Sequence, residues 1–198
     1  MSDAAHHLKF KEPSGWIARF APLAAAGGPV LDVAAGGGRH GRLFLRRGHP
    51  VTFADKDVSA LADLAGDARA TVTEIDLEDG RPWPFPPAAF AAIVVSNYLY
   101  RPHLEGLIAS LAPGGVLLYE TFARGNEAFG RPRNPDHLLR AGELLELARG
   151  RLQVVAYECG VVDEAPAGVK QRLCAVNDLG LSDREDGTPP AHPLRPGQ

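Results

Sequence analysis

The sequence has few cysteines, few aromatic residues and no long apolar run. Two of the 198 residues are cysteines and 7% are aromatic. Cys159 and Cys174 stand in separate apolar segments, and neither has a Cys or His partner in metal-ligand spacing. We therefore expect two buried, reduced thiols and no metal site. No apolar stretch approaches the roughly 18 residues that a membrane-spanning helix needs.

The sequence also lacks a strong charge of either sign. Its formal net charge is −3, with acidic and basic residues interspersed. This speaks against a nucleic-acid partner and against a polybasic membrane patch. Residues 1–11 are polar and do not show the basic-then-apolar pattern of a secretory signal. We expect a cytoplasmic protein with a small-molecule partner, and the sequence leaves its oligomeric state open.

The apolar content is sufficient for one folded domain, because 45% of the residues are hydrophobic. The character of the chain changes near residue 179. Residues 179–198 are rich in proline and charge and have almost no apolar pattern. We predict a single domain over residues 1–178 and a flexible tail over residues 179–198.

Strand-like and helix-like segments alternate along the domain. Strands are expected at residues 29–34, 51–54, 71–75, 90–96, 116–121, 152–157 and 169–176. Helices are expected after Ser14 as the N-cap, at residues 38–47, around Val58, Leu61 and Leu64, at residues 104–111, and around residues 143–148. This alternation predicts an α/β fold: a Rossmann-like, doubly wound, mostly parallel seven-stranded sheet. The last two strands follow each other directly, which predicts an antiparallel closing strand.

A glycine-rich loop, Asp32-Val33-Ala34-Ala35-Gly36-Gly37-Gly38, joins the first strand to the next helix. Glycine lets the backbone turn sharply and approach a ligand closely. Residues 36–41 also fit G-x-G-x-x-G, and Asp55 lies near the spacing of a ribose-binding acid, so a nicotinamide dinucleotide is one candidate ligand. Asp32 favours a second candidate ligand, S-adenosylmethionine. A carboxylate at this position repels a diphosphate and attracts the ammonium and sulfonium groups of S-adenosylmethionine.

Two more acids follow the next two strands. Asp55 can accept hydrogen bonds from both hydroxyls of a ribose. Asp76, with Leu77 after it, can accept from the amine of an adenine. Each acid taken alone also fits an ordinary surface or helix-start charge. Three acids after three successive strands favour a nucleoside ligand, because these strand ends meet at one edge of the sheet.

With these residues placed, the sequence resembles the class I S-adenosylmethionine-dependent methyltransferases over residues 30–176. The similarity includes LDVAAGGGRHG, TFADKD, IDLED and LAPGGVLLYE. The small tellurite-resistance-type subgroup is similar in size and loop pattern. The resemblance implies a cofactor site for S-adenosylmethionine. Its residues would be Asp32, Ala34, Gly36 and Gly38 at the methionine end, Asp55 and Lys56 at the ribose and adenine, Asp76 and Leu77 at the adenine, and Ser96 and Asn97 beside the methyl group.

The methyl acceptor would be bound by the loops after the fourth and fifth strands. Candidate substrate residues are Tyr98, Tyr100, His103, Arg124 and Arg131. His103 is either a base near neutral pH or a helix cap, the tyrosines either line the site or pack in the core, and the arginines either bind an anion or face solvent. Arg39 and His40 either face the methionine carboxylate or point to solvent. No catalytic residue is predicted.

Methyl transfer from a sulfonium needs alignment above all, and a base only when the acceptor must lose a proton. We therefore predict an S-adenosylmethionine-dependent methyltransferase with a small-molecule acceptor. Two alternatives remain open at this point. One is a nicotinamide-dependent oxidoreductase, and the other is a non-catalytic module that binds the cofactor.

Overall fold

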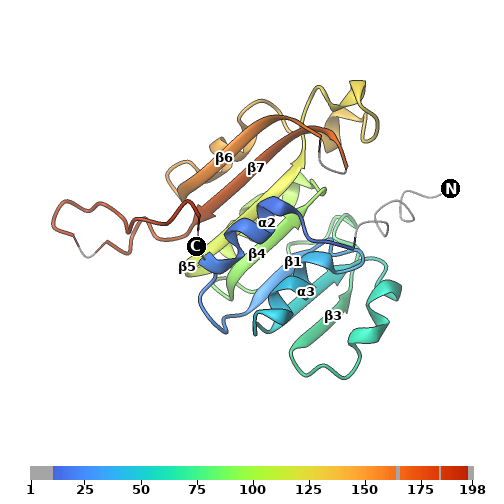
Figure 1. The fold of residues 1–198 in the computed structure, drawn as a ribbon, viewed down its shortest axis with the longest axis horizontal. Helices are drawn as coiled ribbons and strands as arrows, with labels where there is room; N and C mark the ends of the chain where they lie inside the picture. The colour runs from blue at the N-terminus through green and yellow to red at the C-terminus, as the bar shows by residue number, and fades with distance from the viewer. Residues whose placement is uncertain (1–10, 164–165, 183, 196–198) are drawn as a thin grey trace.

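The computed structural model describes residues 11–163, 166–182 and 184–195 (Figure 1). Most of the polar segment discussed above, residues 1–10, lies outside them. The strands are β1 (Val30–Val33), β2 (Val51–Asp55), β3 (Ala70–Glu74), β4 (Phe90–Ser96), β5 (Leu111–Phe122), β6 (Gln153–Val162) and β7 (Gly168–Val176). The helices are α2 (Gly15–Phe20), α3 (Arg39–Arg46), α4 (Leu104–Ala109) and α5 (Glu143–Ala148), with 3-10 helices η1 (Ala21–Leu23), η2 (Ser59–Leu64), η3 (Arg101–His103), η4 (Asn126–Ala128) and η5 (Pro135–His137).

The seven strands form one sheet in the order β3-β2-β1-β4-β5-β7-β6. The pairs β3–β2, β2–β1, β1–β4 and β4–β5 are parallel, and β7 is antiparallel to both of its neighbours. The predicted mostly parallel sheet with one antiparallel closing strand is confirmed. The chain crosses from β3 back to β4, so the strand order reverses between β1 and β4, where such folds bind ligands.

Helices cover both faces of the sheet. Figure 1 shows α2 and α3 over one face, and their side chains form one core cluster with Val94, Leu118 and Cys174. The helices α4 and α5 supply apolar side chains to a second cluster with Ile93 and Val95. Because neighbouring residues of β4 enter opposite clusters, this strand is apolar almost throughout.

The first described helix begins where the sequence predicts. The Ser14 hydroxyl accepts a hydrogen bond from the Trp16 N–H at 3.2 Å, which caps α2. The Trp16 indole N–H donates to the Leu173 carbonyl at 3.4 Å. This contact attaches α2 to β7, which lies 157 positions further along the chain.

Several element predictions need correction. The strand expected at residues 152–157 extends to Val162, and the helix expected at residues 104–111 ends at Ala109. The segment with Leu61 and Leu64 forms a 3-10 helix, in which residues three apart share a face, and both leucines are buried. The fifth strand starts at Leu111 and not at Val116. Leu111 pairs with Phe90, and an irregularity between Phe90 and Ala92 accommodates the intervening Pro-Gly-Gly turn within the strand.

The prediction of two buried cysteines is half right. Both thiols are free, and Cys174 is buried in β7, but Cys159 is exposed. Cys159 lies on β6, the edge strand of the sheet, which pairs only with β7. An edge strand has less cover than an inner strand, so its apolar residues reach solvent.

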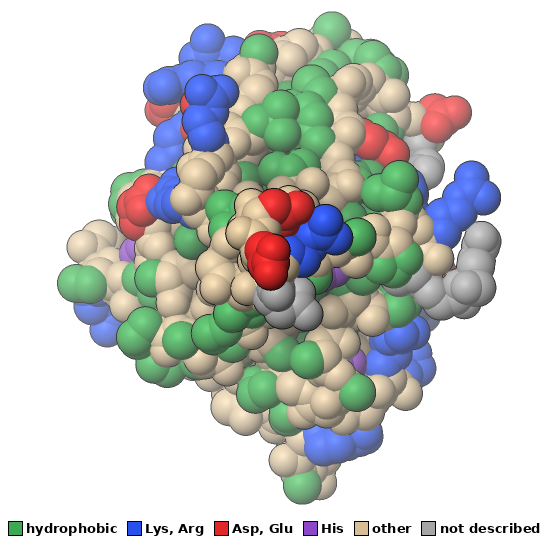
Figure 2. Space-filling model, turned by 90° about the vertical axis from the view of Figure 1, so that its left-hand side faces the viewer, with side chains coloured by type: hydrophobic (Ala, Val, Ile, Leu, Met, Phe, Trp, Pro, Cys, Tyr) green, Lys and Arg blue, Asp and Glu red, His purple; other side chains and the backbone are tan. Residues whose placement is uncertain are grey.

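The described part of the tail returns to the domain. The Arg19 guanidinium donates to the Leu194 carbonyl at 3.0 and 2.9 Å, and the His192 Nε2 lies 2.6 Å from an Asp178 carboxylate oxygen. The flexibility of this segment and the domain boundary at residue 178 stay predictions. Among the described residues, no helix combines the length and the apolar character needed to cross a membrane. On the face shown in Figure 2, basic side chains lie in separate groups and not in one continuous stripe.

Candidate functional site

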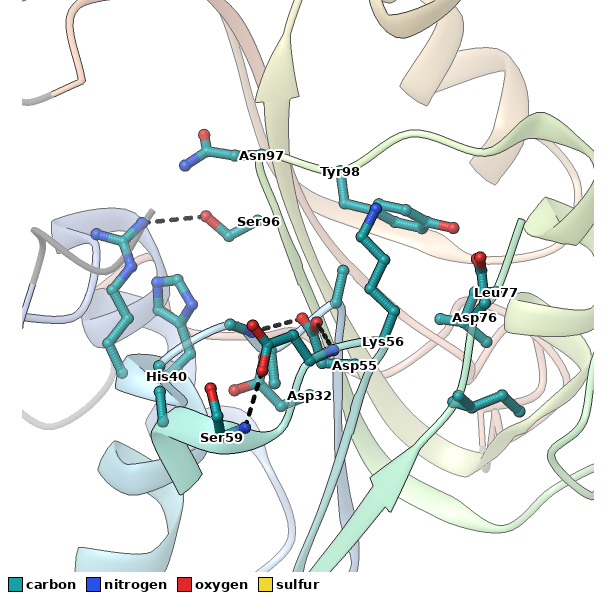
Figure 3. A pocket seen from close by; sticks show the side chains of 18 of the residues that line it. Asp32, His40, Asp55, Lys56, Ser59, Asp76, Leu77, Ser96, Asn97 and Tyr98 are labelled. Carbon is teal, nitrogen blue, oxygen red and sulfur yellow. Dashed lines mark hydrogen bonds between the residues drawn. The ribbon is translucent and has the colours of Figure 1, made fainter. Parts of the chain in front are cut away.

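A cavity of about 430 Å³ opens at the carboxyl ends of β1 to β4, at the point where the strand order reverses. Its volume lies within the usual range of small-molecule sites. Its lining residues are Asp32, Ala34, Ala35, Gly36, Gly37, Arg39, His40, Asp55, Lys56, Asp57, Ser59, Ala60, Ile75, Asp76, Leu77, Glu78, Ser96, Asn97 and Tyr98 (Figure 3). The cavity therefore brings together every predicted cofactor residue except Gly38.

The glycine loop turns its backbone toward this cavity. Gly36 has a φ of +53°, and a Cβ built on it would meet no atom within 4 Å, so the space before it is open. Ala34 has a φ of +52°, an unfavourable conformation for a residue with a Cβ. The Ala35 N–H donates to the Ala54 carbonyl at 3.1 Å and fixes the loop to β2. Strained backbone at a cavity wall is typical of a ligand-binding loop.

Two of the other glycines serve packing. Gly38 starts α3 with a φ of +72°, and a Cβ there would come within 2.6 Å of the Leu61 side chain. A Cβ on Gly41 would overlap the Phe53 ring. Both glycines let α3 lie close to β2 and η2. Gly38 thus packs against Leu61 and Phe53 and does not line the cavity.

Asp32 lies beneath the loop and is 1% exposed. Its carboxylate accepts a hydrogen bond from the Gly41 N–H, in the first turn of α3, at 2.7 Å. Burial raises the pKa of this carboxyl to about 7, although the Gly41 N–H and the nearby Arg39 charge oppose the rise. Asp32 therefore already uses one of the N–H groups that an anion at this helix start needs.

Asp55 and Asp76 are held in the same manner, by backbone donors. The Asp55 carboxylate accepts from the Gly36 N–H at 2.7 Å and from the Asp57 N–H at 3.0 Å. The Asp76 carboxylate accepts from the Glu78 N–H at 2.8 Å. These bonds fix the orientation of both carboxylates and leave further lone pairs for a ligand.

The cavity carries an excess of negative charge. Its lining holds the five acids Asp32, Asp55, Asp57, Asp76 and Glu78 and the two cations Arg39 and Lys56. His40 adds no charge at neutral pH, because burial lowers its pKa to about 3. Its Nε2 accepts a hydrogen bond from the Ser14 N–H at 3.2 Å, which fixes the ring. This arrangement favours a ligand with positive charge.

The residues after β4 form the opposite wall. In Figure 3, Ser96 and Asn97 lie on the side of His40, whereas the Tyr98 ring lies on the side of Lys56 and Leu77. Asn97 has a φ of +55°, and its N–H donates to the Glu120 carbonyl at 2.9 Å. Burial raises the pKa of Tyr98, and its buried hydroxyl has no hydrogen-bond partner among the described residues.

The other predicted acceptor residues lie outside the cavity lining. The His103 ring is buried, with ring centroids 5.4 Å from Trp83 and 4.9 Å from Tyr100. It occupies the N-cap position of α4 without a capping bond from its side chain. Arg124 and Arg131 are exposed on the segment after β5. The structure does not bring His103, Tyr100 or the two arginines to the cavity.

The sequence interpretation missed part of the lining. Asp57, Ser59 and Ala60 follow β2, and Ile75 and Glu78 flank Asp76. Ala60 is the furthest of them, five residues after the end of β2, so a rule that takes the five residues after each observed strand would have included them all. Arg39 and His40, for which solvent exposure was an open alternative, both line the cavity.

No family model matches the chain, and no curated protein matches it in sequence. Solved structures match its fold. The 1,6-didemethyltoxoflavin-N1-methyltransferase of Burkholderia thailandensis, solved with 1,6-didemethyltoxoflavin and S-adenosylhomocysteine, matches with a TM-score of 0.62 at 21% identity, over 82% of this chain and 76% of that chain. A TehB-like S-adenosylmethionine-dependent methyltransferase of Corynebacterium glutamicum matches with a TM-score of 0.58 at 20% identity, over 84% of this chain and 89% of that chain.

A third match is the 4+2 cyclase SpnF, with a TM-score of 0.60 at 18% identity, over 78% of this chain and 76% of that chain. At these identities the matches establish the fold. This chain has the Rossmann-like fold of the class I S-adenosylmethionine-dependent methyltransferases, as the sequence resemblance implied. Because a protein named as a cyclase shares that fold, the reaction has to be argued from the residues of the cavity.

Proposed function

We propose that this chain is an S-adenosylmethionine-dependent methyltransferase that acts on a small-molecule acceptor. The observation that carries the proposal is that two carboxylates already accept hydrogen bonds from backbone N–H groups of the glycine-rich segment. Asp32 takes the Gly41 N–H and Asp55 takes the Gly36 N–H, both at 2.7 Å. A diphosphate at this loop would compete with two carboxylates for these donors and would be repelled by them.

The cavity fits the chemical groups of S-adenosylmethionine. The carboxylates of Asp55 and Asp76 supply acceptors for ribose hydroxyls and for an adenine amine, and Tyr98, Ile75 and Leu77 supply apolar surface for the base. Arg39 and His40, at the other end, suit the methionine part, with Arg39 as partner for its carboxylate. Ser96 and Asn97 then lie beside the methyl group, which the cofactor supplies in an activated form.

The nicotinamide alternative fits the cavity less well. Its fingerprint uses glycines to bring a helix N-terminus to a pyrophosphate. Here Gly38 and Gly41 contact Leu61 and Phe53, and the Gly41 N–H already has a carboxylate partner. Gly38, the position that brings the backbone to a pyrophosphate in that fingerprint, therefore serves packing here, while Gly36 and Gly37 line the cavity.

Isothermal titration with S-adenosylhomocysteine tests the proposal. We expect binding to the wild-type chain and a loss of affinity of ten-fold or more in Asp55→Ala, equivalent to about 1.4 kcal/mol. Asp63→Ala is the matched control, because Asp63 is an exposed acid paired with Arg42 outside the cavity lining. It should bind like the wild type. Binding of NADH without binding of S-adenosylhomocysteine would overturn the proposal.

A further inference from the structure

A row of polar side chains crosses the sheet beside the cavity. Ser96 on β4 pairs with Glu120 on β5, Glu120 pairs with Arg172 on β7, and Arg172 pairs with Glu158 on β6. Paired residues of adjacent strands point to the same face of a sheet, so these four side chains are neighbours. Glu120 is 1% exposed, within a strand whose other residues are mostly apolar. A buried carboxylate is destabilising unless it is paired with a cation or accepts hydrogen bonds, so its partners indicate its role.

The two oxygens of Glu120 have different surroundings. Its Oε1 accepts a hydrogen bond from the Ser96 hydroxyl at 3.1 Å. Its Oε2 lies 3.3 Å from the Arg172 Nε in an ion pair, without a hydrogen bond in the described part of the chain. Arg172 in turn lies 3.3 Å from Glu158. The charge of Glu120 is thus balanced on one side, and its other side faces Ser96.

Ser96 connects this row to the cavity. It lines the cavity, whereas Glu120 does not. The Arg39 Nη2 donates to the Ser96 hydroxyl oxygen at 3.3 Å, which is drawn in Figure 3. With Arg39 as donor and Glu120 as acceptor, the Ser96 hydrogen points away from the cavity. A hydroxyl oxygen has two lone pairs, so one remains for a donor that approaches from the cavity.

Of the other titratable side chains near this wall, the two histidines are poorly placed to accept a proton, whereas Asp32 keeps a second carboxylate oxygen. The His40 Nε2 already accepts a hydrogen bond from the Ser14 N–H, and its ring is buried. Asp32 directs a carboxylate oxygen to the Gly41 N–H of α3. His103 lies outside the lining, between two aromatic rings. The bond from Ser96 to Glu120 is a route by which a proton can leave the cavity on the side of β4.

We propose that Glu120, acting through Ser96, receives the proton that the methyl acceptor gives up, and that the acceptor is a hydroxyl, thiol or N–H nucleophile. The inference rests on the proposed methyltransferase function. In the step, a lone pair of the acceptor atom X forms the X–CH₃ bond as the S–CH₃ bond breaks, leaving neutral S-adenosylhomocysteine. The X–H proton passes to the Ser96 oxygen, and the Ser96 hydrogen passes to Glu120. One positive charge and one carboxylate charge are cancelled, so the step balances.

The test compares two ligands that differ at the methyl position. S-adenosylhomocysteine has a bare sulfur there, whereas sinefungin carries an ammonium group, which donates N–H bonds where the methyl group would lie. Titration calorimetry at pH 7.5 should show that the wild type prefers sinefungin by five-fold or more. In Ser96→Ala and Glu120→Gln the preference, taken as the ratio of the two affinities within each variant, should fall below two-fold.

Two variants separate a positioning role from a structural one. Glu120→Asp keeps the carboxylate and should regain part of the preference for sinefungin. Glu158→Gln removes the other acid beside Arg172. Glu158 is exposed and lies outside the cavity lining, so this variant should keep the full preference for sinefungin. The inference would be overturned if Ser96→Ala and Glu120→Gln lost affinity for both ligands equally. It would also be overturned if neither variant changed the preference for sinefungin. A wild-type chain that binds neither ligand would instead contradict the proposed function.

Discussion

The acids at the carboxyl ends of β1, β2 and β3 that line the cavity are held differently from Glu120 on β5 and Glu143 on α5. In the half formed by β1, β2 and β3, the carboxylates of Asp32, Asp55 and Asp76 accept hydrogen bonds from backbone N–H groups. In the half formed by β4, β5, β7 and β6, Glu120 and Glu143 pair with guanidinium groups. An N–H group carries no net charge, so it does not cancel the charge of Asp55 or Asp76, whereas burial leaves Asp32 partly protonated near pH 7. In the second half the cations neutralise the acids, which then join elements together.

Arg101 shows how the second half uses its charges. It donates to both carboxylate oxygens of Glu143, at 2.7 and 3.0 Å, and to the carbonyls of Asp136 and Leu138, at 2.6 and 2.9 Å. Burial alone would raise the pKa of Glu143, but the bonds from Arg101 and from the Arg140 N–H outweigh burial and lower it. One guanidinium thus ties η3, the segment before α5 and α5 itself together.

The largest predicted effect comes from the substitution that removes the hydrogen bonds of Arg101. Arg101→Met keeps the aliphatic stem and removes all five donors, which leaves Glu143 with only the Arg140 N–H and takes this donor away from two carbonyls. We expect a loss of about 3 kcal/mol in the free energy of unfolding, at the low end for a broken buried pair because the Arg101 side chain is 28% exposed. Urea denaturation measures it.

The comparison also predicts what Arg101→Met leaves intact. Its affinity for S-adenosylhomocysteine should stay within two-fold of the wild type, because Arg101 does not line the cavity. Arg149→Ala is a suitable control, since Arg149 forms an exposed pair with Glu146 and such pairs contribute little. A similar loss of stability in both variants would show that the buried geometry of Arg101 has no special role.

The next effect concerns Asp32, the most buried acid of the first half. Its pKa is about 7 in the folded chain and 3.8 in the unfolded chain, so the folded chain holds the extra proton between these values. The free energy of unfolding should therefore fall as pH rises through this window and level off above it. Between pH 5 and pH 8 the contribution amounts to roughly 2–3 kcal/mol.

Asp32→Asn isolates that contribution. The amide oxygen can still accept the bond from the Gly41 N–H, but the side chain no longer titrates. The difference in unfolding free energy between wild type and variant, measured by denaturation from pH 5 to pH 8, should shrink or reverse with rising pH. A difference independent of pH would mean that Asp32 is ionised in the folded chain throughout this range.

The first half could largely be predicted from the sequence because its signals are local. Asp32, Asp55 and Asp76 each follow a short apolar strand, and parallel strands bring their ends to one edge. The glycines between strand and helix predicted a close backbone approach. Their separate roles could not be predicted, because the contact of Gly38 with Leu61 depends on how η2 packs against α3.

The second half depends on contacts between distant positions. Arg101 reaches Glu143 across 42 positions, and Ser96 reaches Glu120 across 24. Neither spacing is a recognised pattern, so the sequence places Glu120 only within the strand expected at residues 116–121 and does not single out Arg101. The visible signal for Glu120 is an acid within an apolar strand. That signal shows that the acid is unusual, and only the packed sheet shows that its partner is Ser96.

The smallest predicted effect sharpens the comparison within the first half. In Asp76→Asn the side-chain oxygen can still accept the Glu78 N–H and an adenine amine, and only the charge is lost. Because adenine is neutral, we expect the affinity for S-adenosylhomocysteine to fall by about three-fold, equivalent to about 0.6 kcal/mol. Asp79→Asn is the control, since Asp79 pairs with Arg81 outside the cavity lining and should leave titration unchanged. A ten-fold loss of affinity in Asp76→Asn would mean that Asp76 binds the ligand through its charge and not as a hydrogen-bond acceptor. It would then follow that the acids held by backbone N–H groups attract the ligand by their combined negative charge.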